Sequence, residues 1–274
     1  MFSTSRSGGI LLHPSSLPGR FGIGEIGPEA IRWLETLDRM GQRLWQMLPL
    51  GPTGYGNSPY QSLSSFAGNP LLISLEGLRN DGVLTPDDLA MMPSFPKSKV
   101  DFDAAGEVRS AFLRLAAQRF VAQCESSPLM RLSFSVFCER EAWWLDDYAL
   151  FIALKQENGF AAWNEWPPHL ALREPEAMER ARERRAADID EVKALQFFFH
   201  RQWQKVRARA KELGISLIGD IPIFTAHDSA DVWARQDLFE LDEKGSPTVV
   251  AGVPPDYFSA TGQRWGNPLY KWDV

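Results

Sequence analysis

The chain has 274 residues, of which 44% are hydrophobic, so it is long enough to bury one or two sizeable cores. Its formal net charge of -6 and the lack of a basic cluster exclude nucleic acid and anionic membrane surfaces as expected partners. No apolar run approaches the roughly 18 residues of a membrane span. Cys124 and Cys138 fall in different predicted helices, and no secretory signal precedes them, so we expect free thiols in a cytoplasmic protein.

The first fifty residues predict two strands with a helix between them. Residues 9–13 (GILLH) form a short apolar run that ends at Pro14 and predicts a buried strand. A helix is expected to begin at Pro28, because proline favours the first helical position, and to end at Gly41. Residues 44–50 (LWQMLPL) predict a second strand, buried on both faces. This βαβ order gives parallel strands, and ligand sites in such folds lie at the C-terminal ends of the strands.

The segment after the second predicted strand, residues 51–69, is rich in glycine, proline, tyrosine and serine and has no charged side chain. Aromatic faces with hydroxyl and amide groups suit a ring that carries hydroxyls, namely a sugar. A phosphate or a nucleic acid needs lysine and arginine instead. We therefore expect a sugar-binding loop, with candidate contacts at Tyr55, Ser58, Tyr60 and Gln61.

Two glycine patterns are similar to nucleotide-binding motifs but fail the tests for them. Gly51 and Gly56 have the spacing of a P-loop, yet Asn57 stands where lysine is needed and Pro59 blocks the following helix. Residues 22–27 match a dinucleotide fingerprint by letter, but no strand directly precedes them and no acidic residue follows about 20 positions later. Both patterns are interpreted as turns.

The middle of the chain predicts helices. A short strand followed by a turn is expected over residues 71–83. Beyond it, residues 84–214 show no strand alternation and are interpreted as a helical insertion into a β/α protein, ending at Gly214. The candidate helices cover 105–124, 139–157 and 176–213.

Conspicuous side chains in this block have a structural interpretation. The adjacent carboxylates at 87–88 and 146–147 point apart on predicted helices and are expected to face solvent. The scattered histidines give no metal-ligand spacing, so no metal is expected. Three tryptophans are expected in the core, namely Trp143, Trp144 and Trp163.

Residues 216–224 (SLIGDIPIF) predict a third buried strand that contains Asp220 just before Pro222. A charged side chain inside such a strand is costly unless it is paired or faces a polar site. One interpretation is a carboxylate that caps a neighbouring loop. The interpretation we favour is a site residue at the C-terminal rim of a strand, where ligand sites of this class lie.

A hairpin is expected over residues 238–250, with its turn at 243–245 (EKG). It is followed by a second long loop over residues 252–270, which again combines aromatic rings, amides and one carboxylate. Two loops of the same chemistry are expected to form the two sides of one groove. The candidate contacts of the second loop are Asp256, Tyr257, Phe258, Gln263, Trp265 and Asn267.

Four segments carry a resemblance to a known family: ILLHPSSLPG, LWQMLPLGPTGYGNSPYQS with SSFAGNP, LIGDIPIF, and GVPPDYFSATGQRWGNPLY. Together they resemble the amylomaltases, the 4-α-glucanotransferases of glycoside hydrolase family 77, from about Gly9 to the last residue. The resemblance implies an α/β fold, here a partial (β/α)₈ TIM barrel with a large helical insertion, and no cofactor. The implied partners are α-1,4-glucans, whose donor part is held as a covalent glycosyl-enzyme and passed to the 4-hydroxyl of another glucan or of glucose.

The same resemblance implies roles for individual residues. Tyr55 matches a tyrosine of the family's outer glucan-binding surface, and Tyr60 matches the ring that stacks on the sugar at the cleavage point, with Ser58 beside it. Asp220 matches the carboxylate at the end of the third barrel strand. Residues 256–267 match a loop that closes over the glucan and favours a sugar acceptor over water.

The catalytic carboxylates of the family are expected after Val274, so none is expected in this chain. A retaining mechanism needs two carboxyl groups about 5–5.5 Å apart, and Asp220 and Asp256 match binding positions instead. We therefore expect an N-terminal segment that is inactive alone. Two alternatives stay open: a maltodextrin-binding module without chemistry, and a hydrolase of the α-amylase clan. The expected domains are 1–83 (first barrel strands and glucan-binding loop), 84–214 (helical insertion) and 215–274 (third strand, hairpin and active-site loop).

Overall fold

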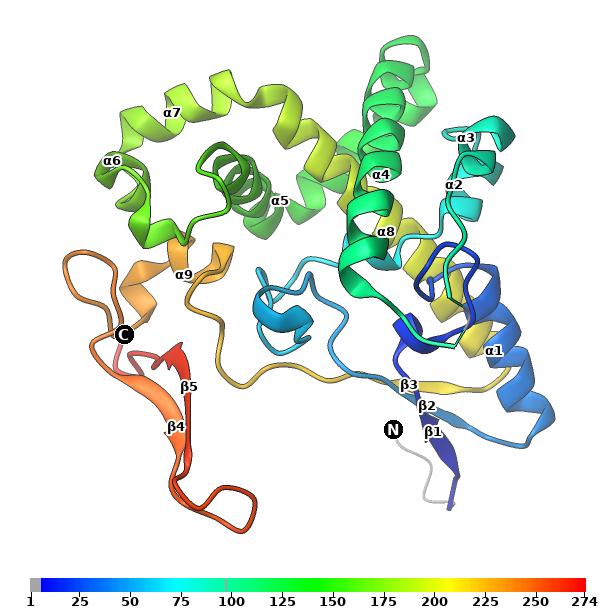
Figure 1. Ribbon diagram of the computed structural model, residues 1–274. Helices are drawn as coiled ribbons and strands as arrows, with labels where there is room; N and C mark the ends of the chain where they lie inside the picture. The colour runs from blue at the N-terminus through cyan, green and yellow to red at the C-terminus, as the bar shows by residue number, and fades with distance from the viewer. Residues whose placement is uncertain (1–5, 97) are drawn as a thin grey trace. The chain divides into compact units, whose positions relative to one another are not determined.

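The computed structural model describes residues 6–96 and 98–274 and shows a mixed α/β protein (Figure 1). The chain divides into two compact units. Unit 1 consists of Met1–Leu50, Gly68–Phe137 and Ala194–Ile221, and unit 2 consists of Gly51–Ala67, Cys138–Lys193 and Pro222–Val274.

Unit 1 contains a parallel sheet in the order β1 (Gly9–Leu11), β2 (Leu44–Gln46) and β3 (Ser216–Ile218). The three predicted strands are therefore present, but each is shorter than expected. The prediction that the second strand is buried on both faces is wrong, because Trp45 is fully buried whereas the next side chain, Gln46, is exposed. Successive side chains of a strand point to opposite faces, and only one face of β2 is covered.

The predicted helix between the first two strands is confirmed as α1 (Pro28–Arg39). Pro28 occupies the first turn, where its missing N–H costs nothing, and Ala30, Leu34 and Leu37 form the buried stripe. The helix stops before Gly41, whose φ of 69° lies in the left-handed region that glycine tolerates.

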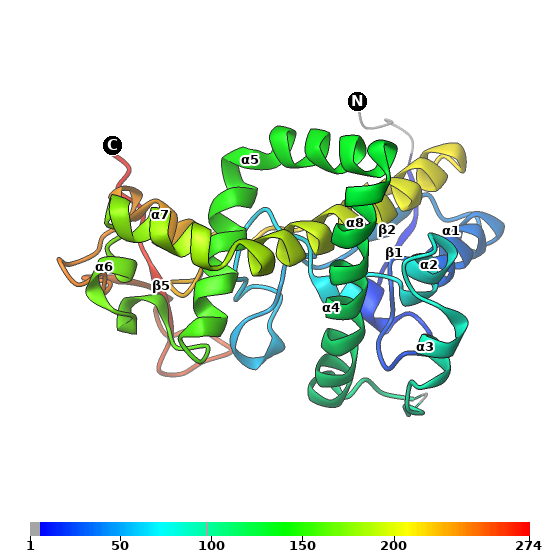
Figure 2. The ribbon, with the colours of Figure 1, turned by 90° about the horizontal axis from the view of Figure 1, so that it is seen from above.

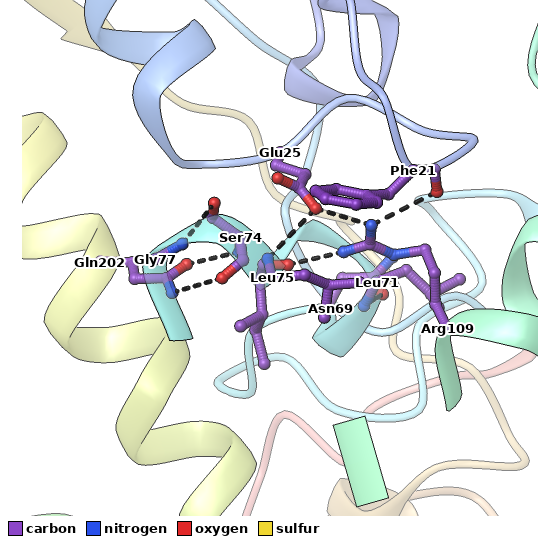
Figure 3. Close-up of polar contacts among 10 residues, drawn as sticks. Phe21, Glu25, Asn69, Leu71, Ser74, Leu75, Gly77, Arg109 and Gln202 are labelled. Atoms are coloured by element: carbon purple, nitrogen blue, oxygen red, sulfur yellow. Dashed lines mark hydrogen bonds and ion pairs between the residues drawn. The ribbon is translucent and has the colours of Figure 1, made fainter. Parts of the chain in front are cut away.

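The strand predicted over residues 71–83 is wrong: this segment forms α2 (Leu75–Asn80). Ser74 explains the difference, because its hydroxyl accepts the Gly77 amide at 3.1 Å and so starts a helix. The Gln202 side chain then pairs with the Ser74 backbone, accepting from its amide at 2.6 Å and donating to its carbonyl at 3.0 Å (Figure 3). This bond pair gives the Ser74 backbone the partners that a strand neighbour would supply. The turn predicted after it is present, with Gly82 at φ 75°.

Helices cover most of residues 84–214, as predicted. The predicted helix 176–213 is interrupted at Arg185, and the other two are longer than expected. The remaining helices are α3 (Pro86–Ala90), α4 (Phe102–Ser126), α5 (Pro128–Glu157), α6 (Pro168–Ala171), α7 (Pro175–Arg184), α8 (Ala186–Glu212) and α9 (Ala230–Ala234). Short 3₁₀ turns lie at Pro14–Ser16, Tyr55–Asn57, Pro70–Leu72, Trp163–Glu165 and Gln236–Leu238.

In unit 1, α4 and α8 cross (Figure 2). A cluster of phenylalanines packs between them. Phe120 of α4 stacks on Phe197 of α8 with 5.4 Å between ring centroids, and it meets Phe198 edge-on at 5.1 Å. Phe134 of α5 adds a third contact to Phe120, again edge-on, with 5.4 Å between ring centroids. Aromatic pairs in this geometry contribute beyond the area they bury, so the cluster fixes how these helix segments pack in unit 1.

Unit 2 is built around tryptophans on α5, α9 and the loops between helices. Trp163, Trp166 and Trp233 are buried, and each indole N–H donates to a backbone carbonyl at 2.7–3.1 Å. The prediction that Trp163 belongs to the core is confirmed, and Trp144 packs against the same core. The prediction is wrong for Trp143, whose side chain is 66% exposed.

Unit 2 also contains an antiparallel hairpin of β4 (Val250–Val253) and β5 (Gln263–Pro268). The smaller hairpin predicted over 238–250 is present as an antiparallel bridge between Leu241 and Pro247, with Gly245 at φ 79° in the turn.

Cys124 and Cys138 are unpaired, as predicted, and burial raises the pKa of the Cys138 thiol to about 11. Within the described part of the chain, no helix combines the length and the apolar character that crossing a bilayer requires.

A buried ion pair joins α4 to the loop before α1 in unit 1 (Figure 3). The fully buried Arg109 donates to the Glu25 carboxylate at 2.6 Å and to the Ile73 carbonyl at 2.6 Å. Arg109→Met is expected to lower the free energy of unfolding by about 3–5 kcal/mol, because it leaves Glu25 buried without its cation. Urea unfolding measures the change.

The exposed pair of Arg32 and Glu29 provides the matched control for this variant. Arg32→Met is expected to cost less than about 1 kcal/mol, because solvent screens a surface pair. Equal losses for the two variants would contradict a structural role for the buried pair.

Asp88 is buried, contrary to the prediction that it faces solvent, whereas its neighbour Asp87 is exposed. Asp88 forms a capping box with Thr85 at the start of α3 and pairs with Arg119. The Arg119 guanidinium lowers the pKa of the Asp88 carboxyl from 3.8 to about 2. Burial of the carboxyl opposes this shift, and hydrogen bonds from Thr85 add to it. A folded-state pKa below the unfolded value means that the ionised form stabilises the fold above pH 3.8, and that this stabilisation is lost as the pH falls toward 2.

Asp88→Asn is therefore expected to be less stable than the natural chain at neutral pH, by about 0.5–1 kcal/mol after allowing for the exposure of Arg119. The gap is expected to close as the pH falls toward 2. Asp87→Asn is the control and is expected to change stability by less than about 0.5 kcal/mol. Urea unfolding over a pH series gives both curves, and a gap that stays constant down to the lowest pH would refute the assignment.

Candidate functional site

The predicted sugar-binding loop is a compact turn of unit 2 that folds back on itself. Thr53 and Ser62 form an antiparallel bridge, and the Gly54 amide donates to the Gln61 carbonyl at 2.7 Å. Gly51 is required for this closure, because a Cβ there would lie 2.5 Å from the Ser62 hydroxyl oxygen. The bonds hold the two ends of the loop together and leave its tip outside.

The tip presents Ser58 and Tyr60. Gly56 and Asn57 both have φ in the left-handed region, at 68° and 55°, so the chain reverses there. The Ser58 hydroxyl accepts the Tyr60 amide at 3.3 Å, and the Tyr60 ring is exposed. The side chain of Tyr55 lies outside what the structure describes, so its role on an outer glucan-binding surface stays a prediction.

Helix α9 supports the C-terminal end of the loop. The Ala230 amide donates to the Leu63 carbonyl at 2.9 Å, and the Ser65 amide donates to the Asp231 carboxylate at 2.9 Å. Burial raises the pKa of the Asp231 carboxyl, and the Ser65 amide opposes that shift. These bonds attach the loop to the tryptophan core that α9 helps to form.

The second loop, predicted over 252–270, is largely a β-hairpin, so its expected irregular structure is wrong. Val250 pairs with Pro268 and Val253 with Gln263, with an irregularity between the two pairs. Gly252 allows the close approach of the strands, because a Cβ there would lie 2.5 Å from the Gln263 carbonyl oxygen. The glycines that suggested a loop are the residues that let this hairpin bend and close.

Asp256, Tyr257 and Phe258 lie in the connection between the two strands, at the opposite end of the hairpin from Asn267. One Asp256 carboxylate oxygen accepts the Phe258 and Ser259 amides at 2.9 and 2.8 Å. The carboxylate therefore holds the turn in shape, and both neighbouring rings are almost fully exposed.

At the base of the hairpin, Asn267 reaches the predicted sugar-binding loop. The Gln61 amide donates to the Asn267 side-chain oxygen at 3.4 Å. The buried Asn267 amide in turn donates to the carbonyls of Phe224 and Thr225 at 3.3 and 3.1 Å. Near it, Trp265 donates to the Gln263 side chain at 3.1 Å. The structure thus brings together one candidate residue from each of the two predicted loops within unit 2.

Asp220 belongs to unit 1 and is not inside a strand. β3 ends at Ile218, Asp220 is exposed, and its carboxylate accepts the Ile221 amide at 2.9 Å. The buried strand predicted through Phe224 is wrong, since Ile221 is 78% exposed and Pro222 has no N–H to continue the ladder. Asp220 remains at the C-terminal end of a parallel strand, where the fold class places ligand sites.

His13 is a residue at the same sheet edge that the sequence analysis did not single out. It follows β1, contacts the Ser15 hydroxyl at 2.7 Å and lies 3.3 Å from the Pro49 carbonyl. Burial lowers the pKa of its imidazole. Among the described residues, no cluster of histidine, cysteine or acidic side chains could hold a metal ion.

A family model described as 4-alpha-glucanotransferase matches residues 12–274. The chain belongs to this family. It is 52% identical over 269 residues to a 4-alpha-glucanotransferase of Thermus thermophilus, covering 98% of this chain and 53% of the relative. A chloroplastic/amyloplastic 4-alpha-glucanotransferase of Solanum tuberosum is 42% identical, covering 97% of this chain and 46% of that protein.

Solved structures of amylomaltases share the fold of this chain. An amylomaltase from Streptococcus agalactiae, in complex with acarbose, superimposes with a TM-score of 0.93 at 38% identity, covering 98% of this chain and 54% of that chain. An amylomaltase from Corynebacterium glutamicum shares the fold at a TM-score of 0.67 and 18% identity. The chain spans about half the length of the curated relatives it matches.

Proposed function

We propose that this chain is the glucan-binding part of a 4-α-glucanotransferase that acts on maltooligosaccharides in the cytoplasm. The observation that carries the proposal is the contact of Gln61 with Asn267, which joins two segments of sugar-type chemistry in a member of this family. The side-chain amides of Gln61 and Asn267, whose contacting atoms lie 3.4 Å apart, offer hydrogen-bonding groups for an uncharged sugar. The exposed ring of Tyr60, next to Gln61 in the sequence, offers a stacking face.

In this proposal, β1, β2 and β3 are the first three strands of a (β/α)₈ barrel. Support comes from their parallel order and from the position of the helical block, which separates neighbours β2 and β3 in the sequence but not in the sheet. The division into 1–83, 84–214 and 215–274 then corresponds to the first strands, the insertion, and the third strand with its hairpins.

The proposed reaction is a retaining double displacement. One carboxylate attacks the sugar, a second carboxyl group protonates the leaving glucan and later deprotonates the acceptor, which is another glucan or glucose. Asp256 is unsuited to either role, because its carboxylate accepts two amides of its own turn. The two reacting carboxylates are proposed to come from the half of the relatives that this chain does not match.

In this scheme the residues of the present chain bind and position the glucan. Tyr60 stacks on the sugar at the cleavage point, Gln61 binds hydroxyls while Asn267 holds its amide in place, and Tyr55 contacts the chain further out. Tyr257 and Phe258 close over the bound glucan and exclude water, which favours transfer over hydrolysis.

Product analysis with maltotriose tests the proposed activity. The complete enzyme that carries this chain is expected to release glucose together with glucans longer than maltotriose, because each donor part is passed to another sugar. Products no longer than maltose would show hydrolysis instead. Residues 1–274 alone are expected to give no products, and turnover by this segment would contradict the assignment of the acids.

Tyr60→Ala is expected to weaken transfer from maltotriose, because it removes the stacking ring. The transition-state binding lost is about 1–3 kcal/mol, as for other aromatic binding anchors, and kcat/KM for glucose release measures it. Phe160→Ala is the matched control, since Phe160 is also an exposed ring of unit 2 and is not a candidate glucan-binding residue. Equal kcat/KM for Tyr60→Ala and the natural chain would rule out the stacking role.

A further inference from the structure

Unit 2 contains a cavity of about 400 Å³ that the candidate site does not use. Its walls come from the segment 64–66, from α5, from α9, and from Thr225 and Tyr270. This volume is in the range of small-molecule sites, about 300–1,000 Å³. None of Tyr60, Gln61 and Asn267 lines the cavity.

Two exposed aromatic rings form one corner of the cavity. Phe66 is 52% exposed and Trp143 is 66% exposed, and the rings meet edge-to-face with 4.6 Å between centroids and 71° between planes. Trp143 was expected in the core, but its neighbours Trp144 and Tyr148 occupy the core-facing side of α5. The indole is therefore left at the surface beside a second ring, and both rings line the cavity.

Charged and polar groups surround the aromatic corner. The half-buried Asp147 pairs with Arg173 at 2.6 Å, and Asp231 accepts the Ser65 amide at 2.9 Å. A carboxylate has about four acceptor positions, so both groups can also accept from hydroxyls. Arg235 contributes an exposed guanidinium that is paired with Asp237 at 2.9 Å.

On the far side, the Tyr270 and Thr225 hydroxyls lie 3.0 Å apart. Thr225 also connects the cavity to the candidate site, because its carbonyl accepts the Asn267 amide at 3.1 Å. Within unit 2, Thr225 therefore both lines the cavity and contacts Asn267 of the candidate site.

We propose that this cavity is a second binding site for α-1,4-glucan, with Phe66 and Trp143 as its stacking platform. The occupant is uncharged and rich in hydroxyls, because acceptor and donor groups line a cavity whose corner is aromatic. A phosphorylated or strongly anionic ligand would meet Asp147 and Asp231. The assignment to α-1,4-glucan, in preference to another sugar, rests on the proposed function. The site holds a part of the glucan remote from the bond that is cut.

Hydroxyl-radical footprinting with maltoheptaose tests the location directly. Phe66, Trp143 and Tyr60 are exposed and oxidise in the free protein, as does Phe160, the internal control. Maltoheptaose is expected to slow oxidation of Phe66 and Trp143 in proportion to occupancy and to leave Phe160 unchanged. Cellohexaose, whose β-1,4-linked chain is straight, is expected to protect neither ring of the platform.

The outcomes separate this site from the proposed function. Protection of Tyr60 without protection of Trp143 overturns the second site and leaves the glucanotransferase proposal standing. Protection of Trp143 in a protein that yields no transfer products from maltotriose supports the site and refutes the transferase. Equal protection by cellohexaose overturns the assignment to α-1,4-glucan.

A binding measurement gives the size of the effect. Trp143→Ala is expected to weaken maltoheptaose binding at this site by about tenfold, as for an aromatic anchor, and calorimetric titration measures it. Phe160→Ala is the matched control and is expected to bind as the natural chain does. The variant removes an exposed side chain, so a thermal melt that matches the natural chain establishes that it folds. Unchanged binding in that folded variant contradicts the proposal.

Discussion

One buried amide, the side chain of Asn267, carries the organisation of the candidate site. Its nitrogen donates to two carbonyls of the segment 224–225, and its oxygen accepts from Gln61. A buried amide that lost these partners would carry an unpaired polar group, at a cost of about 1–3 kcal/mol. The hairpin, the segment after β3 and the predicted sugar-binding loop therefore share one anchor.

The sequence predicted best where one residue type has one physical consequence. Pro28 starts α1 and Gly41 follows its end, as expected from a missing N–H and a positive φ. Gly214, with φ 64°, follows α8 in the same way. The parallel pairing of the first two strands was also predictable, because a helix between two short apolar runs gives a βαβ unit.

Predictions failed where a distant partner decides the local structure. Residues 71–83 have a strand-like composition, but Ser74 caps a helix, and Gln202, which lies 128 residues away, satisfies its backbone. Trp143 was assigned to the core by residue type, although its position on α5 turns it away from the face that Trp144 and Tyr148 bury. A helical wheel of α5 would have separated these residues. The extent of β4 and β5 depends on pairing between strands, which composition does not encode.

Of the candidate site, residue types and loop chemistry were predictable and geometry was not. The two sugar-type segments were recognised as related, but their point of contact depends on a hairpin that the glycines concealed. Asp220 was favoured as a residue at the C-terminal rim of a strand, and it lies just beyond the end of β3, although the strand is shorter than predicted and Asp220 is exposed.

A double-mutant cycle tests the central claim, that Gln61 and Asn267 act together on one bound glucan. Gln61→Ala, Asn267→Ala and the double variant are compared by kcat/KM for transfer from maltotriose. If the two residues are coupled, the transition-state stabilisation lost in the double variant is expected to differ from the sum of the two single losses by about 0.5 kcal/mol or more. Losses that add, with no interaction energy, would contradict a shared binding surface.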